Sequence, residues 1–338
     1  MIWRGEHDMT REAASTPLPT GGLASGVRTQ GSGLGTPRRG VVAAIGAFDG
    51  VHRGHQVLLG DMVARAAELG ARAVCVTFDP DPAQVLHPDV HPRALCSTAE
   101  RERLIRAVGV DEVYVWPFTP AVAQMSPEAF MADLCARYPL IEVWVGVDFG
   151  FGRDRAGNVQ TLVELGQRYG FGVHARAPVY DGDRPISSTR IRDLLEAGEV
   201  AEAARLLGRP YRLAGEVLGG AQRGRQLGFP TANLVPPAEQ VLPAHGVYAG
   251  RATVEGTTYA SVANVGTRPT FGEDRPLIEV HLLDYAGDLY GRHLAFDFVE
   301  RVRTIRRFES IEALRAQITA DIASARVCLS SADLGPGA

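Results

Sequence analysis

Short apolar runs alternate with amphipathic stretches between residues 40 and 180. The runs VVAAIG, AVCVTF, IEVWVGV and GVHARAPV have the length of buried strands. Apolar residues at helical spacing predict helices over 55–70 and 159–169. A third helix is expected in SPEAFMADLCARY, with Ser126 as its N-cap and Pro127 at its first position. This alternation predicts an α/β domain, in which helices cover both faces of a parallel sheet.

The pattern changes after about residue 208. The segments GVYAGRATV, TYASVANVG, LIEVHLLD and HLAFDFVERVR are strand-like, and turns rich in Gly and Asp separate them. They predict an antiparallel barrel or sandwich, followed by an amphipathic helix over about 311–328. The predicted organisation is a disordered arm (1–37), an α/β domain (38–187), connecting helices (188–208), a β domain (209–330) and a disordered tail (331–338).

Composition and charge exclude several classes of protein. The formal net charge of −4 argues against general nucleic-acid binding, and no apolar run approaches the roughly 18 residues of a membrane helix. The four cysteines form no CxxC pair, which suits a reducing cytosol, and no apolar segment near the N-terminus resembles a signal peptide. A cytoplasmic protein without nucleic-acid or membrane partners is therefore expected.

All 35 basic residues are arginines, because the chain contains no lysine. A P-loop kinase that needs GK[ST] and an enzyme that forms a lysine Schiff base are both excluded. Any phosphate group must be bound by arginine, backbone amides, helix ends or a metal ion.

The segment FDGVHRGH joins a predicted strand to a predicted helix. Its two histidines, His52 and His55, are three residues apart and face the same way at a helix start. A helix N-terminus attracts phosphate, Gly54 leaves room for it, and imidazoles can donate to its oxygens. The alternatives are ordinary packed or surface histidines, or a metal site that lacks a nearby third ligand. In a parallel sheet this loop would lie at the ligand-binding edge.

A second stretch, PISSTRIRDLL, opens a helix with hydroxyl residues and adds Arg190 and Arg192. Ser and Thr here would serve as ordinary helix caps. The arginines are what a triphosphate site would add, because each guanidinium is a planar, permanently charged donor.

The segment GEVLGGAQRGRQLGFPTANL, residues 215–234, is the third candidate. It contains the glycines Gly219, Gly220, Gly224 and Gly228, whose loop could wrap a phosphate with its amides. Thr231 and Asn233 follow, two apart on an extended segment that Pro230 stiffens, so their side-chain oxygens face one way and suit Mg²⁺. The alternative is a glycine-rich hairpin that ends in an ordinary turn.

These motifs resemble a known family. IGAFDGVHRGH, VTFDPDP, VGVDFGFG and ISSTRIR resemble the adenylyltransferase half of the bacterial bifunctional riboflavin kinase/FAD synthetases, which is related to the HxGH nucleotidylyltransferases. LGFPTAN, GVYA, VGTRPTFG and LYG resemble the riboflavin kinase half. The resemblance covers about residues 40–330. It implies a Rossmann-like nucleotidylyltransferase domain followed by an antiparallel β-barrel kinase domain with a terminal helix.

The resemblance assigns roles in the first half. His52 and His55 would contact ATP phosphates. The loop around them would be shaped by Gly46, Phe48, Asp49 and Gly54. The phosphates would be held from the other side by Ser188, Thr189 and Arg192, and the residues near the flavin would be Asp148 and Phe149. The implied reaction is direct attack of the FMN phosphate on the α-phosphorus of ATP, with pyrophosphate leaving. Positioning and charge stabilisation would supply the rate.

In the second half, Thr231 and Asn233 would bind Mg²⁺ and an ATP phosphate. Glu279 falls at the family's catalytic base, where a carboxylate would take the proton of the riboflavin 5′-hydroxyl as it attacks the γ-phosphate. Read without the resemblance, Glu279 is a solvent-facing strand residue. Arg306 and Phe308, in IRRFES, would border the flavin; the alternative is that they simply form part of a solvated surface.

One position departs from the family. Where the family usually reads FDPHP, this chain has Asp81 in place of the histidine, which would make the first site more acidic. The expected function is bifunctional flavin-cofactor synthesis with riboflavin, FMN and ATP as small-molecule substrates, in an enzyme of a family whose members can associate into homo-oligomers. The alternatives are a riboflavin kinase with an impaired adenylyltransferase half, a non-catalytic flavin-binding protein, and an adenylyltransferase for another acceptor.

Overall fold

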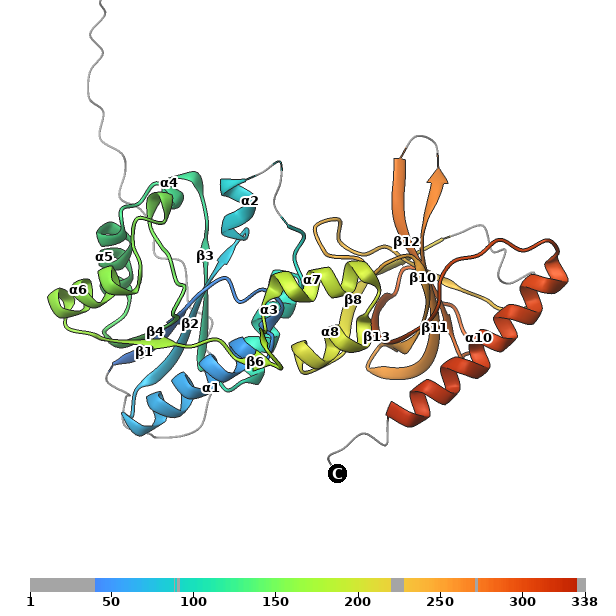
Figure 1. Ribbon diagram of the computed structural model, residues 1–338, viewed down its shortest axis with the longest axis horizontal. Coiled ribbons are helices and arrows are strands. Elements are labelled where there is room, and N and C mark those ends of the chain that lie inside the picture. Colours follow the sequence, from blue (N-terminus) through green and yellow to red (C-terminus); the bar gives the residue numbers. More distant parts are fainter. Residues whose placement is uncertain (1–39, 88, 90–91, 220–227, 271–272, 333–338) are drawn as a thin grey trace, which may run out of the picture. The chain divides into compact units, whose positions relative to one another are not determined.

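A parallel sheet forms the centre of the N-terminal module, residues 40–187. The computed structural model describes residues 40–87, 89, 92–219, 228–270 and 273–332. The described residues of this module form a sheet of five strands in the order β3-β2-β1-β4-β5 (Figure 1). The strands are β1 (Val41–Ile45), β2 (Arg72–Asp79), β3 (Glu112–Pro117), β4 (Leu140–Gly146) and β5 (Gly172–Arg176).

Strand β1 is apolar at every position because both faces of the sheet are covered. Its alternate residues Val41, Ala43 and Ile45 belong to a core that includes residues of α5 (Pro127–Arg137) and α6 (Val159–Tyr169). Val42 and Ala44 belong to a core with residues of α1 (Arg53–Glu68) and α3 (Thr98–Ala107). This is the two-sided burial expected for a parallel strand. The predicted α/β architecture of this module is confirmed.

The helices begin at side-chain caps that the sequence supplies. His52, Ser97, Ser126, Asn158 and Ser187 each accept a hydrogen bond from a backbone N–H three residues on. The capped helices are α1 (Arg53–Glu68), α3 (Thr98–Ala107), α5 (Pro127–Arg137), α6 (Val159–Tyr169) and α7 (Ser188–Ala197). Shorter elements are η1 (Asp49–Val51), α2 (Pro82–Leu86), α4 (Pro120–Ala123), η2 (Arg153–Arg155), β6 (Tyr180–Asp181) and β7 (Arg184–Pro185).

The order of the strands reverses at β1. Its parallel neighbours are β2 on one side and β4 on the other, so the connections that follow β1 and β4 leave the same edge of the sheet in opposite directions. Such a switch point is where open α/β sheets bind ligands. The loop 46–52, which follows β1, therefore starts at the edge where a site is expected.

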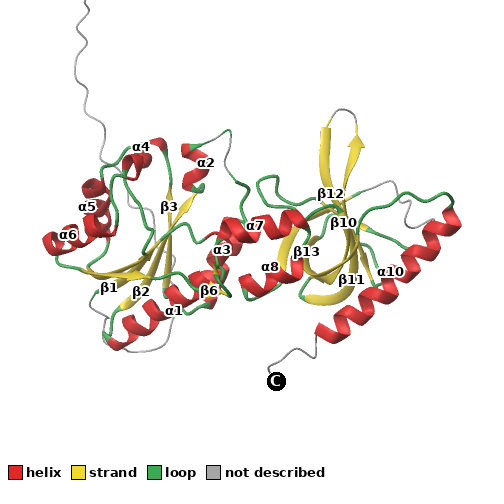
Figure 2. Ribbon diagram, in the orientation of Figure 1, coloured by secondary structure: helices red, strands yellow, loops and turns green. Residues whose placement is uncertain are grey.

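The described residues after 208 form a closed barrel of six strands in the order β10-β11-β12-β9-β8-β13 (Figure 2). We call residues 209–332 the barrel module. Its elements are β8 (Tyr211–Leu218), β9 (Ala232–Leu234), β10 (Gly246–Val254), β11 (Thr257–Thr270), β12 (Glu273–Leu282), β13 (His293–Arg303) and α10 (Ile311–Ala332). Every pairing in the barrel is antiparallel. The pattern allowed a barrel or a sandwich, and the structure is a barrel.

The helices α7 and α8 (Val200–Leu207) connect the two modules. Their buried residues Ile191, Leu195 and Leu206 share one apolar core with the barrel strands. Leu95 and Ile186, from the N-terminal module, belong to the same core. The described residues from 40 to 332 accordingly belong to a single compact unit.

Some elements differ from the sequence-based expectation. Strand β3 lies at the edge of the sheet, and its residues are mostly half-buried, which explains why EVYVWP lacks the apolar run of its neighbours. Helix α3 was not predicted because it is rich in charged residues. The terminal helix extends to Ala332 instead of ending near 328. The arm at 1–37 and most of the predicted tail lie outside the described residues.

Strands β10 and β13 approach closely at Gly250. A Cβ at Gly250 would overlap the Asp297 carbonyl oxygen and the Phe296 ring, whereas a Cβ at Gly266 meets no atom within 4 Å. We expect Gly250→Ala to destabilise the barrel by about 1–3 kcal/mol, which lowers its thermal midpoint by about 5 °C or more. Thermal unfolding followed by circular dichroism measures this change. Gly266→Ala is the matched control, and equal midpoints for the two variants would contradict the packing.

Candidate active sites

The loop 46–52 has an unusual backbone. Phe48 and Val51 have φ values of 50° and 41°, in the left-handed region that non-glycine residues rarely adopt, and Gly50 has a φ of 74°. Such a conformation costs free energy and persists where surrounding contacts impose it. In this loop those contacts are hydrogen bonds to the backbone carbonyls.

Every carbonyl from Ala47 to Val51 accepts a hydrogen bond from within the protein. The donors are Thr77 and Arg101 for Ala47, the Val51 amide for Phe48, Ser188 for Asp49, Arg209 for Gly50, and Gln56 and Arg209 for Val51. None of these five carbonyl oxygens is therefore left without an internal donor. Carbonyl oxygens repel phosphate oxygens. Because each of these carbonyls already accepts a hydrogen bond from within the protein, its repulsion of an anion near the loop is reduced.

The Asp49 side chain links the loop to other parts of the chain. Its carboxylate is buried and accepts hydrogen bonds from the Leu95 amide at 2.9 Å and from Arg192 Nη2 at 2.6 Å. Burial raises the pKa of the Asp49 carboxyl, and the Arg192 charge opposes that shift. Arg192 also donates from Nε to the Arg93 carbonyl. The structure therefore brings two predicted site residues together as an ion pair, and a direct contact of Arg192 with phosphate stays a prediction.

The two histidines stack at the start of α1. Their ring centroids are 3.6 Å apart, and the Phe48 ring packs edge-on against His55. His52 Nδ1 accepts a hydrogen bond from the His55 amide at 3.3 Å, so a neutral His52 carries its proton on Nε2. Burial lowers the pKa of His52 to about 4 and the pKa of His55 well below its usual value. Both imidazoles are therefore neutral at pH 7.

The other predicted residues of this site lie around the loop. A Cβ at Gly54 would lie 3.1 Å from the His52 ring, and one at Gly46 would lie 3.2 Å from the Phe48 ring, so a side chain at either position would require the ring to shift by a few tenths of an ångström. Ser188 is half-buried and Thr189 is exposed. Asp148 and Phe149 follow β4, which runs parallel to β1, so they leave the same edge of the sheet as the loop. Asp148 is exposed, and Phe149 stacks on Phe151 with 5.3 Å between ring centroids.

Asp81, which stands where the family usually has a histidine, is the N-cap of helix α2. Its carboxylate accepts the Ala83 amide at 2.8 Å and caps α2. It also lines a cavity of about 260 Å³ together with Arg101 and Gln240. Its negative charge contributes to the raised pKa of Asp49, which places this acidic group in the electrostatic surroundings of the loop.

The second site crosses three neighbouring strands of the barrel. Glu279 on β12 pairs in register with Asn264 on β11 and with Asn233 on β9. Asn264 Nδ2 donates to Glu279 Oε2 at 3.3 Å, which orients the carboxylate. Thr231, Glu279, Arg306 and Phe308 line one cavity of about 480 Å³. The structure thus brings together four residues that the sequence singled out.

Asn233 has the property that a cation ligand requires. The residue is buried, and its Nδ2 makes a long hydrogen bond of 3.5 Å to the Leu218 carbonyl. Within the described part of the chain, its buried Oδ1 has no hydrogen-bond partner. A buried amide oxygen without a donor is costly unless a cation or an unseen donor meets it. Hard oxygen ligands of this kind fit Mg²⁺.

The glycines of the predicted phosphate loop are only partly described. Gly219 is exposed at the end of β8, and Gly228 has a φ of 87°, which requires glycine. Gly220 and Gly224 lie outside the described residues.

Four further polar residues line the same cavity, and the sequence reasoning missed them. They are Asn264, His281, Arg303 and Asp321. His281 Nδ1 lies 2.7 Å from the Pro230 carbonyl oxygen and holds the segment that precedes Thr231. The alternation of β12 could have found His281, because it lies two residues after Glu279. No sequence pattern links Arg303 to Asp321, whose buried ion pair at 2.8 Å joins β13 to α10.

Comparisons with known proteins agree with this geometry. The family model of FAD synthetase matches residues 36–190, and the family model of riboflavin kinase matches residues 207–329. Two relatives are named bifunctional riboflavin kinase/FMN adenylyltransferase. The protein from Pseudomonas fluorescens is 42% identical, and the match covers 85% of this chain and 93% of the relative. The protein from Escherichia coli is 38% identical, and the match covers 86% of this chain and 93% of the relative.

A solved structure is similar over both modules. It is described as a macrolide-efflux protein from Streptococcus pneumoniae, is 34% identical, and covers 86% of this chain and 95% of its own with a TM-score of 0.78. Among the described helices of the present chain, none is long and apolar enough to span a membrane. Because two family models match in sequence and the curated relatives span most of both chains, this chain belongs to the family of bifunctional riboflavin kinase/FMN adenylyltransferases.

Proposed function

We propose that this chain phosphorylates riboflavin to FMN at the barrel cavity and adenylylates FMN to FAD at the loop 46–55. One observation carries the proposal: a single chain holds two built sites, one with stacked neutral histidines and one with a carboxylate beside an orphaned amide oxygen. The product of the second site is the acceptor substrate of the first. Two family matches in one chain favour this reading over a kinase alone or a non-catalytic flavin carrier.

In the kinase reaction, Glu279 accepts the proton of the riboflavin 5′-hydroxyl as that oxygen attacks the γ-phosphorus of ATP, and ADP leaves with the electron pair of the broken P–O bond. Asn264 fixes the carboxylate through its hydrogen bond. Asn233 Oδ1 and the Thr231 hydroxyl would hold Mg²⁺, which offsets phosphate charge when bound. The cavity of about 480 Å³ has the size of a small-molecule site, and Arg306, whose guanidinium lies 4.8 Å from the centre of the Phe308 ring, borders it.

In the adenylyl transfer, a phosphate oxygen of FMN attacks the α-phosphorus of ATP, and pyrophosphate leaves with the electron pair of the broken P–O bond. His52 Nε2–H and His55 donate to the phosphate oxygens, and the N-terminus of α1 adds its dipole. Neutral imidazoles suit this role, because each carries one N–H group and can donate a hydrogen bond without first taking up a second proton. Arg192, Ser188 and Thr189 would flank the phosphates from α7, and Asp148 and Phe149 would border the flavin.

A cytosolic location and small-molecule substrates complete the proposal. The four cysteines are all free thiols, which suits a reducing compartment.

The direct test supplies purified protein with ATP, Mg²⁺ and either riboflavin or FMN, and follows the flavins by chromatography. Riboflavin should give FMN and then FAD, and supplied FMN should give FAD. If FMN forms but never becomes FAD, the adenylyl-transfer half of the proposal is wrong; if riboflavin is not phosphorylated, the kinase half is wrong.

Asn233→Ala tests the cation site. Because this change removes the orphaned Oδ1, we expect FMN formation from riboflavin to fall by about 100-fold or more. FAD formation from supplied FMN should stay within about two-fold of the wild type, and this second activity reports that the chain is folded. Equal loss of both activities would show that Asn233 supports the fold and not the kinase site.

His55→Ala tests the other site. The lost donor should lower FAD formation from supplied FMN by about 10²- to 10³-fold. Phosphorylation of riboflavin by the same preparation should be unchanged, because the barrel cavity contains no atom of α1. A variant that still makes FAD at the wild-type rate would remove His55 from the reaction.

The neutral state of His52 predicts an acid sensitivity. Its folded pKa of about 4 is below the ordinary 6.5, so the unfolded chain takes up a proton between these values that the folded chain does not. Stability is therefore complete above pH 6.5 and falls as the pH approaches 4. Between pH 7 and pH 5 the wild type should lose about 2 kcal/mol more than His52→Asn, which retains a capping side chain.

Urea unfolding measures this difference through the fluorescence of Trp116 and Trp144, which lie in the N-terminal module. The comparison of pH slopes cancels any pH-independent cost of the substitution. Identical slopes for the two proteins would mean that His52 is protonated normally in the folded state.

A further inference from the structure

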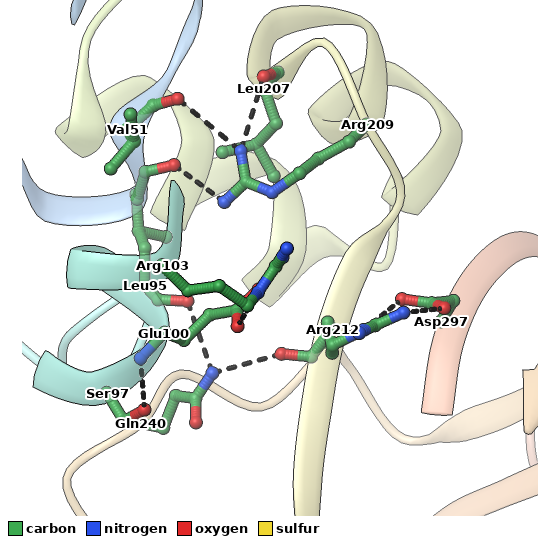
Figure 3. A network of polar contacts seen from close by, with 11 residues as sticks. Val51, Leu95, Ser97, Glu100, Arg103, Leu207, Arg209, Arg212, Gln240 and Asp297 are labelled. Carbon is green, nitrogen blue, oxygen red and sulfur yellow. Dashed lines mark hydrogen bonds and ion pairs between the residues drawn. The ribbon is translucent and has the colours of Figure 1, made fainter. Parts of the chain in front are cut away.

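The loop of the first site is held by a residue that comes after both connecting helices. Arg209 follows α8 and precedes β8. Its Nη2 donates to the Gly50 carbonyl at 2.7 Å, and its Nη1 lies 3.4 Å from the carbonyls of Val51 and Leu207 (Figure 3). One guanidinium therefore reaches two successive carbonyls of the loop and the end of α8.

Gln56 completes this clamp from α1. Its Nε2 donates to the Val51 and Leu207 carbonyls, both at 2.8 Å. The same two carbonyls are thus shared by Gln56 and Arg209. Both donors act on the part of the loop whose backbone is left-handed, at Gly50 and Val51.

Leu95 fills the space beside Gly50. A Cβ at Gly50 would lie 2.7 Å from Leu95 Cδ1, and Arg209 holds the carbonyl of the same residue. Release of the Gly50 carbonyl would let the peptide rotate and would move His52, two residues on. A misplacement of about 1 Å can cost about 100-fold in rate at a site that acts by positioning.

The contacts of Arg209 do not resemble those of a surface ion pair. Glu100, the carboxylate whose charge reaches it, is bound instead by both donor atoms of Arg103, at 2.8 Å and 2.7 Å. Burial lowers the pKa of Arg209, yet its guanidinium remains a cation at any working pH. The hydrogen bonds described for Arg209 all go to carbonyl oxygens.

We propose that Arg209 is a positioning residue for adenylyl transfer, which sets the loop 50–52 for the phosphates of ATP. This inference rests on the proposed function of the first site. Arg209 lies within the riboflavin kinase match, residues 207–329, and outside the FAD synthetase match, which ends at residue 190. The adenylyl-transfer site is therefore completed by a residue of the segment that resembles the other enzyme.

The test compares Arg209→Gln, Arg209→Lys and Arg103→Gln in the full chain, with FMN, ATP and Mg²⁺. For Arg209→Gln we expect kcat/KM for ATP to fall by about 10- to 100-fold, while the KM for FMN is unchanged. Arg209→Lys should recover part of this loss, because one ammonium can still donate to the Gly50 carbonyl. Arg103→Gln removes a neighbouring exposed guanidinium that bonds only to Glu100 among the contacts described, and it should match the wild type.

Phosphorylation of riboflavin, measured on the same preparations, separates positioning from folding. It should be equal in all four proteins. The inference is overturned if Arg209→Gln makes FAD as fast as Arg103→Gln, if both activities fall together, or if the loss appears only in the KM for FMN. A wild type that makes no FAD would instead overturn the proposed function, and this inference with it.

Discussion

The buried carboxylate of Asp49 is the constraint on which the first site depends. A charge taken out of water needs a partner of opposite sign and hydrogen bonds to its oxygens. Arg192 supplies the first and the Leu95 amide supplies part of the second. Leu95 is fixed in turn, because Gln240 donates to its carbonyl and the neighbouring Ala94 exchanges backbone hydrogen bonds with Glu239 and Val241.

The shape of the loop therefore depends on distant parts of the chain. Arg192 is 143 residues beyond Asp49, and Gln240 is 145 residues beyond Leu95. The barrel module and the connecting helices share one apolar core with Leu95 and Ile186. The N-terminal module supplies the sheet and the histidines, and residues from the rest of the chain hold the loop through hydrogen bonds and an ion pair.

Arginines hold the loop of the first site, and they are the basic residues of a chain that contains no lysine. Around the loop, Arg101 donates a hydrogen bond to the Ala47 carbonyl. Arg192 donates to the Asp49 carboxylate, and Arg209 donates to the Gly50 carbonyl. They act first as a scaffold, because a planar guanidinium can reach several acceptors at once. In the proposed adenylyl transfer, the neutral imidazoles and the N-terminus of α1 would then contact the phosphates at the loop, with Arg192 beside them. The barrel site uses different means, with an amide oxygen and a carboxylate in register on neighbouring strands.

The sequence by itself determined many of the elements and the local chemistry. Apolar runs such as VVAAI, the Ser126 cap and the spacing of His52 and His55 are local features, and a pattern of 2 or 3.6 residues records them directly. The resemblance of the motifs added the roles of Thr231, Asn233 and Glu279. Tertiary structure alone decided that Asn264 lies beside Glu279, that Asp321 meets Arg303, and that Arg209 holds Gly50. These contacts join residues up to 159 positions apart, and neither a strand nor a helix period carries information over such distances.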